Sequence, residues 1–226
     1  MRKVGVVIPA AGRGERAGGS VPKQFREIAG VPMLLRTLRP FSTHPSVGDI
    51  VVVLPADVAE TPPDWLMTLL GERLRVVPGG ATRADSVCAG LARLRNDCDV
   101  VLVHDAARPF VSRETIDAVV EVAASGFGAV PCVPLADTVK RTVDGVRIVE
   151  TVDRDGLWRA QTPQGFPRAM LREAYDAAGA RASSFTDEAS MAEANGATVC
   201  VVRDVPSNIK VTSPEDFIFA EILAMR

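Results

Sequence analysis

The amino-acid sequence predicts an α/β protein built on a single doubly wound, mainly parallel sheet. Short valine-rich runs, bounded by proline, glycine or aspartate, alternate with longer amphipathic segments. Nearly continuous β-branched runs are typical of parallel strands that helices cover on both faces. The alternation of strand and helix is repeated four times in the first half of the chain, as it is in open α/β sheets.

The elements of the first half follow one another regularly. The expected strands are residues 4–8, 50–54, 74–77, 100–103 and 129–133, and the expected helices are residues 32–41, 63–70, 83–94 and 113–124. Pro32 and Pro63 stand where proline is favoured, in the first turn of a helix, and Ser112 is a suitable N-cap for the fourth helix.

The pattern changes after the fifth expected strand. Two alternating polar and apolar stretches, residues 139–143 and 146–149, flank Asp144-Gly145, which is a favoured two-residue hairpin turn. No neighbouring segment is available to cover this hairpin. We therefore expect an arm at about residues 135–154 that projects from the sheet.

The α/β pattern then resumes and continues to the end of the chain. Helices are expected at residues 168–178 and 187–194, a strand at 198–202, and a last helix from Pro214 onward. Thr186 and Ser213 are expected to cap the last two helices. No internal repeat or linker divides the sequence, so residues 1–226 are expected to form one domain.

Composition narrows the class of function. The 226 residues include 26 Lys and Arg and 28 Asp and Glu, and this net charge of -2 argues against a nucleic-acid partner. Apolar runs are too short to cross a membrane.

The four cysteines form no C-x-x-C pair and are expected to be reduced and buried, which favours a cytoplasmic location. His44 and His104 alone leave little material for a zinc site or a histidine-based triad, and we expect His104 to pack or hydrogen-bond inside the protein.

A small-residue loop, residues 9–19, follows the first expected strand. Loops at this place in α/β sheets bind phosphates through their backbone N–H groups. A G-x-G-x-x-A pattern begins at Gly12 and formally matches a dinucleotide-binding fingerprint, which would make the protein an NAD-dependent oxidoreductase. The loop does not lead straight into a helix, however, and no acidic residue ends the second strand. Arg16 and Lys23 instead supply cations where phosphates would lie.

Further short motifs occur along almost the whole chain. In order, they are Pro9-Ala-Ala-Gly-x-Gly-x-Arg16, Pro22-Lys-Gln24, Gly79-Gly-x-x-Arg83-x-Asp-Ser86, His104-Asp-Ala-Ala-Arg-Pro109, Asp137-Thr-x-Lys140, Thr151-Val-Asp-Arg154, Thr162-Pro-Gln164, Thr186-Asp-Glu-Ala189 and Asn208-Ile-Lys210. Together they resemble the 2-C-methyl-D-erythritol 4-phosphate cytidylyltransferase family. This resemblance implies a Rossmann-like nucleotidyltransferase fold and transfer of CMP from CTP to that polyol phosphate, with release of pyrophosphate, in non-mevalonate isoprenoid precursor synthesis.

The resemblance also implies a role for individual residues. The catalytic residues would be Arg16, Lys23, Arg154 and Lys210; the CTP-binding residues Pro9, Ala10, Ala11, Gly12, Gly80, Ser86 and Ala106; the substrate-binding residues Arg108, Thr138, Arg154, Thr162 and Lys210; and the Mg²⁺ ligand Asp105. Ala81 departs from the family pattern, which often has a polar or acidic residue there, so selection of cytosine would depend more on backbone groups. Ribitol-5-phosphate cytidylyltransferase is the alternative, because it would use the same CTP loop, and Thr138, Arg154 and Lys210 could hold a polyol phosphate of similar length.

The resemblance gives the expected arm a function. In the family the arm embraces a second subunit, which implies a homodimer in which Thr138 and Arg154 complete the neighbour's substrate site. A lone exposed hairpin is marginally stable in water, and this independently favours pairing of two chains.

Overall fold

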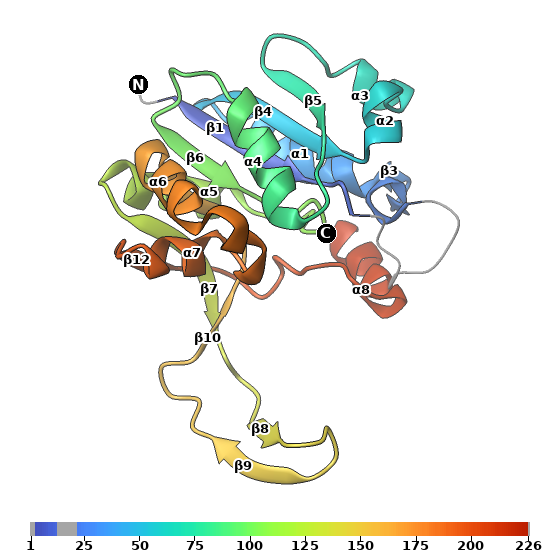
Figure 1. Cartoon of the computed structure of the whole chain (residues 1–226). Coiled ribbons are helices and arrows are strands. Elements are labelled where there is room, and N and C mark those ends of the chain that lie inside the picture. The colour runs from blue at the N-terminus through green and yellow to red at the C-terminus, as the bar shows by residue number, and fades with distance from the viewer. Residues whose placement is uncertain (1–2, 13–21, 226) are drawn as a thin grey trace.

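The valine-rich runs all form strands of the main sheet in the computed structural model, which describes residues 3–12 and 22–225. The strands are β1 (Val4–Pro9), β4 (Val47–Leu54), β5 (Leu74–Pro78), β6 (Val100–Val103) and β7 (Gly128–Pro134). β1 pairs in parallel with β4 and β6, and β4 pairs in parallel with β5. The carboxyl ends of these neighbouring strands therefore lie along one edge of the sheet (Figure 1).

The rest of the main sheet is mixed. β11 (Gln164–Pro167) runs antiparallel to both β6 and β7, β10 (Trp158–Ala160) runs antiparallel to β7, and β12 (Val199–Arg203) runs parallel to β7. In the described part of the chain the sheet has eight strands, and most pairings are parallel, as predicted. Neither β10 nor β11 was expected from the sequence, because both are short and lack a β-branched or alternating pattern.

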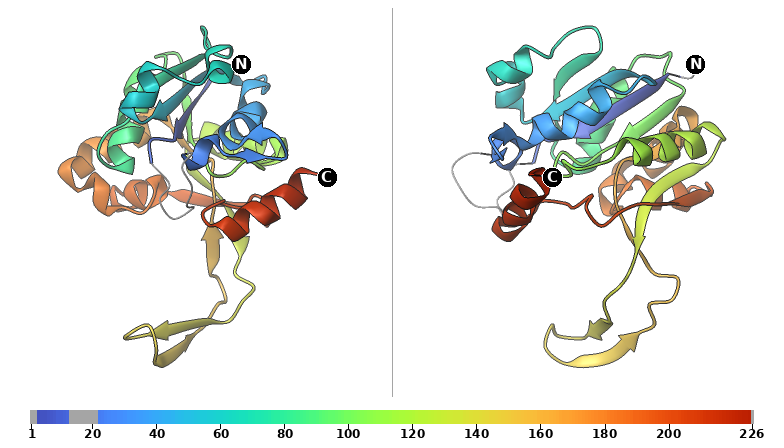
Figure 2. Two further views of the ribbon diagram at one scale, coloured as in Figure 1. Left: turned by 90° about the vertical axis from the view of Figure 1, so that its right-hand side faces the viewer. Right: turned by 180° about the vertical axis from the view of Figure 1, so that it is seen from behind.

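Helices cover both faces of the sheet (Figures 1 and 2). The helical segments are α1 (Met33–Ser42), α2 (Ala56–Glu60), α3 (Asp64–Met67), α4 (Arg83–Arg93), α5 (Arg113–Ala124), α6 (Arg168–Ala178), α7 (Glu188–Ala194), α8 (Pro214–Ala224) and the 3₁₀ helices η2 (Lys23–Phe25) and η3 (Gly179–Ser184). Along β1, Ile8 packs in the cluster that includes residues of α1 and α5, whereas the adjacent Val7 packs with residues of α4, α6 and α7. Alternate side chains of one strand thus enter two different core layers.

Two predictions about helix ends are confirmed and others are wrong. Ser112 and Ser213 cap α5 and α8 through their side chains. Thr186 does not cap α7, because the Asp187 carboxylate accepts a hydrogen bond from Ser190 N at 2.9 Å and Ser190 closes a capping box. The helix expected at residues 63–70 is the four-residue α3, and the preceding α2 was not expected.

The arm is present as a two-stranded antiparallel pair that projects away from the main sheet (Figures 1 and 2). Its strands are β8 (Val139–Thr142) and β9 (Ile148–Val152). The expected two-residue turn is wrong, since residues 143–147 form a longer loop. Asp144 Oδ1 accepts hydrogen bonds from Val146 N and Arg147 N, at 3.0 and 2.7 Å, and so organises this loop instead of a tight turn.

The C-terminal helix packs apart from the two main core layers. Phe217 and Ala220 of α8 form a small cluster with Ile28, which lies in the short hairpin of β2 (Glu27–Ile28) and β3 (Val31–Pro32), and with Val211. This cluster keeps the segment before α8 next to the chain that follows β1.

The cysteines agree only in part with expectation. All four are free, and Cys98 and Cys132 are buried, but Cys88 is exposed on α4. Helices in the described ranges are all too short or too polar to span a membrane.

Candidate active site

The loops that follow β1, β5 and β6 surround a cavity of about 330 Å³ at the carboxyl edge of the sheet. Ligands of open α/β sheets bind at this edge because the loops there converge. Many of the residues singled out in the sequence line it: Pro9, Ala10, Ala11, Gly12, Lys23, Gly80, Ser86, Asp105, Ala106 and Lys210. Gln24, Met33 and Arg83 also line it and were not among the expected site residues.

Two glycines allow one wall of the cavity to form. A Cβ atom at Gly79 would overlap the side chain of Ala11, and a Cβ atom at Gly80 would overlap that of Asp85. The missing side chain at Gly79 therefore lets the loop after β5 approach the loop after β1, and the missing side chain at Gly80 lets the turn lie against the first turn of α4.

Ser86 fixes the turn that contains these glycines. Its buried hydroxyl donates a hydrogen bond to Thr82 O at 3.0 Å and accepts one from Gly80 N at 3.2 Å. Thr82 in turn caps α4 through a capping box with Asp85. The amino end of α4 and the glycine turn are thus one hydrogen-bonded unit, and the Ser86 hydroxyl is already used within it.

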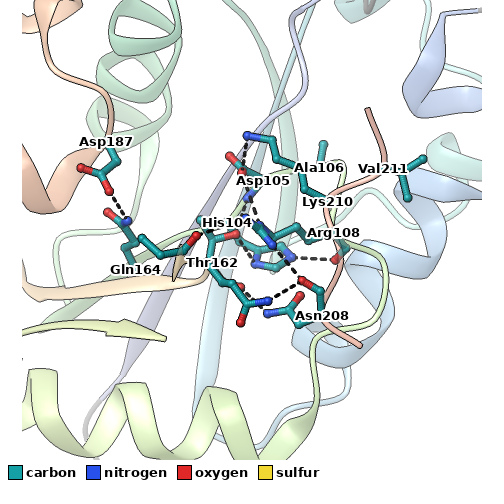
Figure 3. Close-up of polar contacts among 12 residues, drawn as sticks. His104, Asp105, Ala106, Arg108, Thr162, Gln164, Asp187, Asn208, Lys210 and Val211 are labelled. Carbon is teal, nitrogen blue, oxygen red and sulfur yellow. Dashed lines mark hydrogen bonds and ion pairs between the residues drawn. The ribbon is translucent and has the colours of Figure 1, made fainter. Parts of the chain in front are cut away.

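Asp105, just after β6, lines the cavity and lies close to three cations, of which Lys210 and Arg108 are labelled in Figure 3. Lys210 Nζ lies 2.8 Å from its Oδ2 atom, Arg108 Nε lies 3.6 Å from Oδ2, and Arg83 Nη2 lies 3.5 Å from Oδ1. Burial alone would raise the pKa of Asp105, but Lys210, Arg83 and Arg108 together hold that pKa well below its ordinary value. The carboxylate therefore stays ionised at any physiological pH.

Lys23 approaches the same region from the chain that follows β1. Its Nζ atom donates a hydrogen bond to Val211 O at 2.9 Å, next to Lys210 in the sequence. The neighbouring Gln24 donates from Nε2 to Ala10 O at 2.9 Å and so ties η2 to the loop after β1. Lys23 and Lys210, two of only four lysines in the chain, thus both line the cavity.

Arg83 is the cation that the sequence did not identify as a site residue. Its guanidinium makes two hydrogen bonds to the carboxylate of Glu188, at 2.7 and 2.9 Å, and Tyr175 Oη donates to the same carboxylate at 3.1 Å. Burial disfavours its charged form, but Glu188 and then Asp105 raise the pKa of Arg83 above its ordinary value. The buried Glu188 therefore holds a permanent positive charge at the rim of the cavity. Because Glu188 lies in a separate helix far along the chain, no local pattern could reveal this pair.

Within the part of the chain that the structure describes, no cluster of three or more Asp, Glu, His or Cys residues could cage a metal ion. Asp105 would be a single protein ligand. Its Oδ1 atom is the less engaged oxygen, since Arg83 approaches it only to 3.5 Å. One carboxylate together with phosphate oxygens and water is a donor set that suits Mg²⁺.

Comparison with known proteins identifies the family. The model of the 2-C-methyl-D-erythritol 4-phosphate cytidylyltransferase family, IspD, matches residues 4–226. The chain belongs to this family. It is 44% identical to the enzyme of that name from Frankia casuarinae, over 99% of this chain and 82% of the relative. The crystal structure of the cytidylyltransferase from Thermus thermophilus superposes with a TM-score of 0.84 at 35% identity and covers 99% of this chain and 100% of that one.

Some relatives in the family are longer. The chain is 41% identical to the bifunctional enzyme IspD/IspF from Desulfotalea psychrophila over 98% of its own length, but it spans only 56% of that relative. The chain nevertheless has the same sheet as the solved structures from the family and covers almost their whole length.

Two residues expected to contact the cytidylyltransferase substrate lie beneath the cavity wall. Arg108 is buried and donates from Nη1 to Asn208 O at 2.8 Å and, more weakly, from Nη2 to Ala160 O at 3.5 Å. Thr162 is also buried, and its hydroxyl oxygen accepts a hydrogen bond from Asp105 N at 3.0 Å. Both side chains thus support the residues that line the cavity.

His104 completes this support and, as expected, is an internal hydrogen-bonding residue. Its Nε2 atom lies 3.0 Å from Arg108 O and its Nδ1 atom 3.0 Å from Thr162 Oγ1. A carbonyl oxygen can only accept, so Nε2 carries the proton and Nδ1 accepts from the Thr162 hydroxyl. Complete burial lowers the pKa of His104 to about 4, which keeps the ring neutral.

The remaining residues expected in a cytidylyltransferase site lie elsewhere. Thr138 and Arg154 belong to the arm and do not line the cavity of their own chain. The strands of the arm project away from the main sheet (Figure 1). The Arg154 guanidinium donates a hydrogen bond to Ala136 O within the arm. Arg16, like most of the G-x-G-x-x-A pattern, lies outside the described residues.

Proposed function

We propose that the protein transfers CMP from CTP to 2-C-methyl-D-erythritol 4-phosphate in this cavity and releases pyrophosphate. The observation that carries the proposal is the juxtaposition of a backbone-lined wall with a cationic group of side chains. Ala10, Ala11 and Gly80 line the cavity with small side chains or none, which would give a flat base room next to the main chain, while Lys23 and Lys210 would lie where a polyphosphate extends.

The chemistry explains why cations are needed. An oxygen of the substrate phosphate attacks the α-phosphorus of CTP and forms a new P–O bond. The bond from that phosphorus to the bridging oxygen breaks, and pyrophosphate leaves with the electron pair. Two anions must meet, and negative charge develops on the α-phosphoryl oxygens. Lys23, Lys210 and Arg16 would offset this charge, so no nucleophilic side chain is required.

Selection of cytosine would depend on main-chain acceptors. Cytosine presents an amino donor where uracil presents a carbonyl oxygen. The Ser86 hydroxyl already donates to Thr82 O, so its contribution would be to hold the carbonyl groups near Gly80 in place. Pro9, Gly12 and Ala106 would add the opposite side of the nucleotide site.

Asp105 would be the protein ligand that holds Mg²⁺ when CTP is bound. When bound, the ion would neutralise the polyphosphate and favour departure of pyrophosphate. Lys210 and Arg83 would keep the Asp105 carboxylate ionised and oriented for this contact.

The working unit would be a homodimer formed through the arm. Thr138 and Arg154 lie in the arm and would complete the substrate site of the second subunit, whose cavity wall is supported by Arg108 and Thr162. The large exposed apolar residues Val143 and Val146 near the arm's tip support such a contact. The four free cysteines are consistent with a cytoplasmic location.

Turnover measurements test the proposal. Release of pyrophosphate should require CTP, Mg²⁺ and 2-C-methyl-D-erythritol 4-phosphate, and ribitol 5-phosphate should be the poorer acceptor. Lys23→Ala and Lys210→Ala should each lower kcat by about 10²–10³, as loss of one charge-stabilising donor does in other enzymes. Lys3→Ala is the control, because Lys3 is exposed and pairs with Asp97.

Two results would contradict it. Preference for ribitol 5-phosphate would overturn the assigned substrate, and unchanged turnover in Lys210→Ala would remove that residue from the mechanism. Thermal melting provides a second measurement, since CTP with Mg²⁺ should raise Tm and NAD should not.

A further inference from the structure

We infer that Asn208 is a positioning residue for the transfer reaction, because its side-chain amide holds both members of the Lys210–Asp105 ion pair. The inference rests on the proposed function only in naming the reaction that the pair serves. The hydrogen bonds of Asn208 assign this role.

Asn208 is fully buried at the meeting point of three segments (Figure 3). Its Nδ2 atom donates to Thr162 O, between β10 and β11, at 3.0 Å, and to Asp204 Oδ2, after β12, at 2.7 Å. Its main-chain oxygen accepts from Arg108 Nη1 at 2.8 Å and from Gln161 Nε2 at 2.9 Å. Four hydrogen bonds thus connect this residue to the loop after β6, to the β10–β11 connection and to Asp204 after β12.

The first consequence concerns Lys210. Beyond Asn208 the next fixed backbone point is Val211, whose N–H donates to Ala107 O at 2.8 Å and whose carbonyl accepts from Lys23 Nζ at 2.9 Å. Only Ile209 and Lys210 lie between these two anchors. The Lys210 backbone therefore has little freedom, and its half-exposed side chain extends from a fixed point to Asp105.

The second consequence concerns Asp105. Thr162 accepts from Asn208 through its carbonyl oxygen, and it accepts from Asp105 N through its hydroxyl oxygen. The same amide group of Asn208 therefore fixes the residue on which the Asp105 backbone rests. Lys210 and Asp105, which lie far apart in the sequence, share one anchor.

The chemistry of the amide explains why asparagine stands here. Asp204 Oδ2 and Thr162 O are both acceptors, so the side chain between them must supply two hydrogens, which the Nδ2 group does. Serine could satisfy only one of them. Aspartate would supply none and would bring a second carboxylate against Asp204. Because a displacement of about 1 Å at a reacting group can cost about 10²-fold in rate, loss of this anchor should reduce catalysis.

A double-mutant cycle tests the inference. Asn208→Ser should lower kcat about 10- to 100-fold, with a smaller change in KM for CTP. In the Lys210→Ala background the same substitution should have a clearly smaller effect, because the action through Lys210 is lost there and only the action through Asp105 remains. Multiplicative losses in the double variant, or an unchanged kcat in Asn208→Ser, would overturn the inference.

Asp49→Asn is the matched control for instability. Asp49 is also a fully buried polar residue, and it accepts hydrogen bonds from Arg75 and Arg95 N, but it lies near the start of β4, at the end of the strand away from the cavity. The Asp49→Asn substitution should lower Tm, as Asn208→Ser does, and should leave kcat of the folded enzyme unchanged.

A measurement without substrate separates this inference from the proposed function. Reductive ¹³C-methylation labels the few lysines, and the Lys210 signal is identified by its loss in Lys210→Ala. This signal should be broad, as for an immobilised side chain, in the wild type and in Asp49→Asn, and should sharpen in Asn208→Ser. If it does not sharpen, Asn208 does not position Lys210, whichever reaction the enzyme performs.

The reciprocal exchange provides a rescue. Asp204→Asn combined with Asn208→Asp restores a donor–acceptor pair between the two residues but leaves Thr162 O without a donor. The double exchange should recover part of the kcat that Asn208→Asp alone loses, and no recovery would show that the Asp204 link does not contribute.

Discussion

At the scale of single residues, His104 and Asp105 are neighbours after β6, yet their surroundings keep one neutral and the other ionised. Asp105 faces Lys210 and two guanidinium groups and remains ionised, whereas His104 is enclosed and remains neutral. The neutral ring is what the hydrogen bonds require, since its Nδ1 atom must accept from Thr162. A charged imidazole would reverse this contact and leave the hydroxyl hydrogen of Thr162 without Nδ1 as its acceptor.

This arrangement predicts a pH-dependent stability. An unfolded histidine binds a proton below its ordinary pKa of 6.5, but folded His104 does so only near 4. Between these values the unfolded state binds more protons, so the free energy of unfolding should fall by up to about 1.4 kcal/mol for each unit by which pH decreases. Urea unfolding of the wild type and of His104→Gln at several pH values measures the difference. Equal pH dependence of the two proteins would contradict the assignment.

The sequence could indicate individual site residues only where they belong to a local pattern. Asp105, Lys23 and Lys210 stand in short motifs, and all three line the cavity. Arg83 stands in a motif too, but its pairing with Glu188 depends on how α4 and α7 pack, which no local pattern contains. Asn208 gave no separate signal, because its importance lies in contacts with residues from distant segments.

At the scale of elements, the packing of α4 against β1 positions one wall of the cavity. A Cβ atom at Gly90 would overlap Val7 Cγ1 and lie 3.1 Å from Val53 Cγ2. The absence of a side chain at residue 90 thus lets the helix lie directly on the sheet. The amino end of α4, which carries Arg83 and Ser86, is brought to the loops by this close packing.

Gly90→Ala should therefore destabilise the protein although it is a favourable change for an isolated helix. Alanine gains about 1 kcal/mol of helix propensity over glycine, but overpacking between α4 and two strands costs about 1–3 kcal/mol. We expect a net loss of stability, measured by denaturant unfolding. Cys88→Ala, an exposed change on the same helix, is the control and should be nearly neutral. A stabilised Gly90→Ala protein would show that the helix can move away from the sheet.

The sequence predicted those elements whose pattern is intrinsic to the segment. The valine-rich strands and the caps at Ser112 and Ser213 are of this kind. β11 is not, because its residues Gln164–Pro167 are a strand only through pairing with β6 and β7. The arm loop was mispredicted for a related reason, since Asp144 bonds two backbone N–H groups and holds a wider connection than Asp-Gly normally forms.

At the scale of the whole molecule, the cavity and the arm are separate parts of one chain. Lys23, Arg83 and Lys210 line the cavity. Thr138 and Arg154 belong to the arm, which projects away from the main sheet (Figure 2). A chain whose arm serves its own cavity and a chain whose arm serves its neighbour's cavity differ in a measurable way.

Mixed dimers distinguish the two arrangements. Lys23→Ala and Arg154→Ala should each be nearly inactive when expressed alone. Co-expressed in equal amounts, they should regain roughly a quarter of wild-type activity, because half of the dimers are mixed and each mixed dimer has one intact site. No recovery would indicate that the arm acts within its own chain, or does not act on the substrate at all.

The base of the arm has one further consequence. Leu135 N donates a hydrogen bond to Leu157 O at 3.1 Å, so the points where the chain leaves and rejoins the main sheet are adjacent. Residues that close together can be joined by a short turn. A short turn could therefore replace the segment between them, residues 136–156. Its removal or exchange should leave the sheet intact, and natural variation in its length would carry no cost to the hydrophobic core.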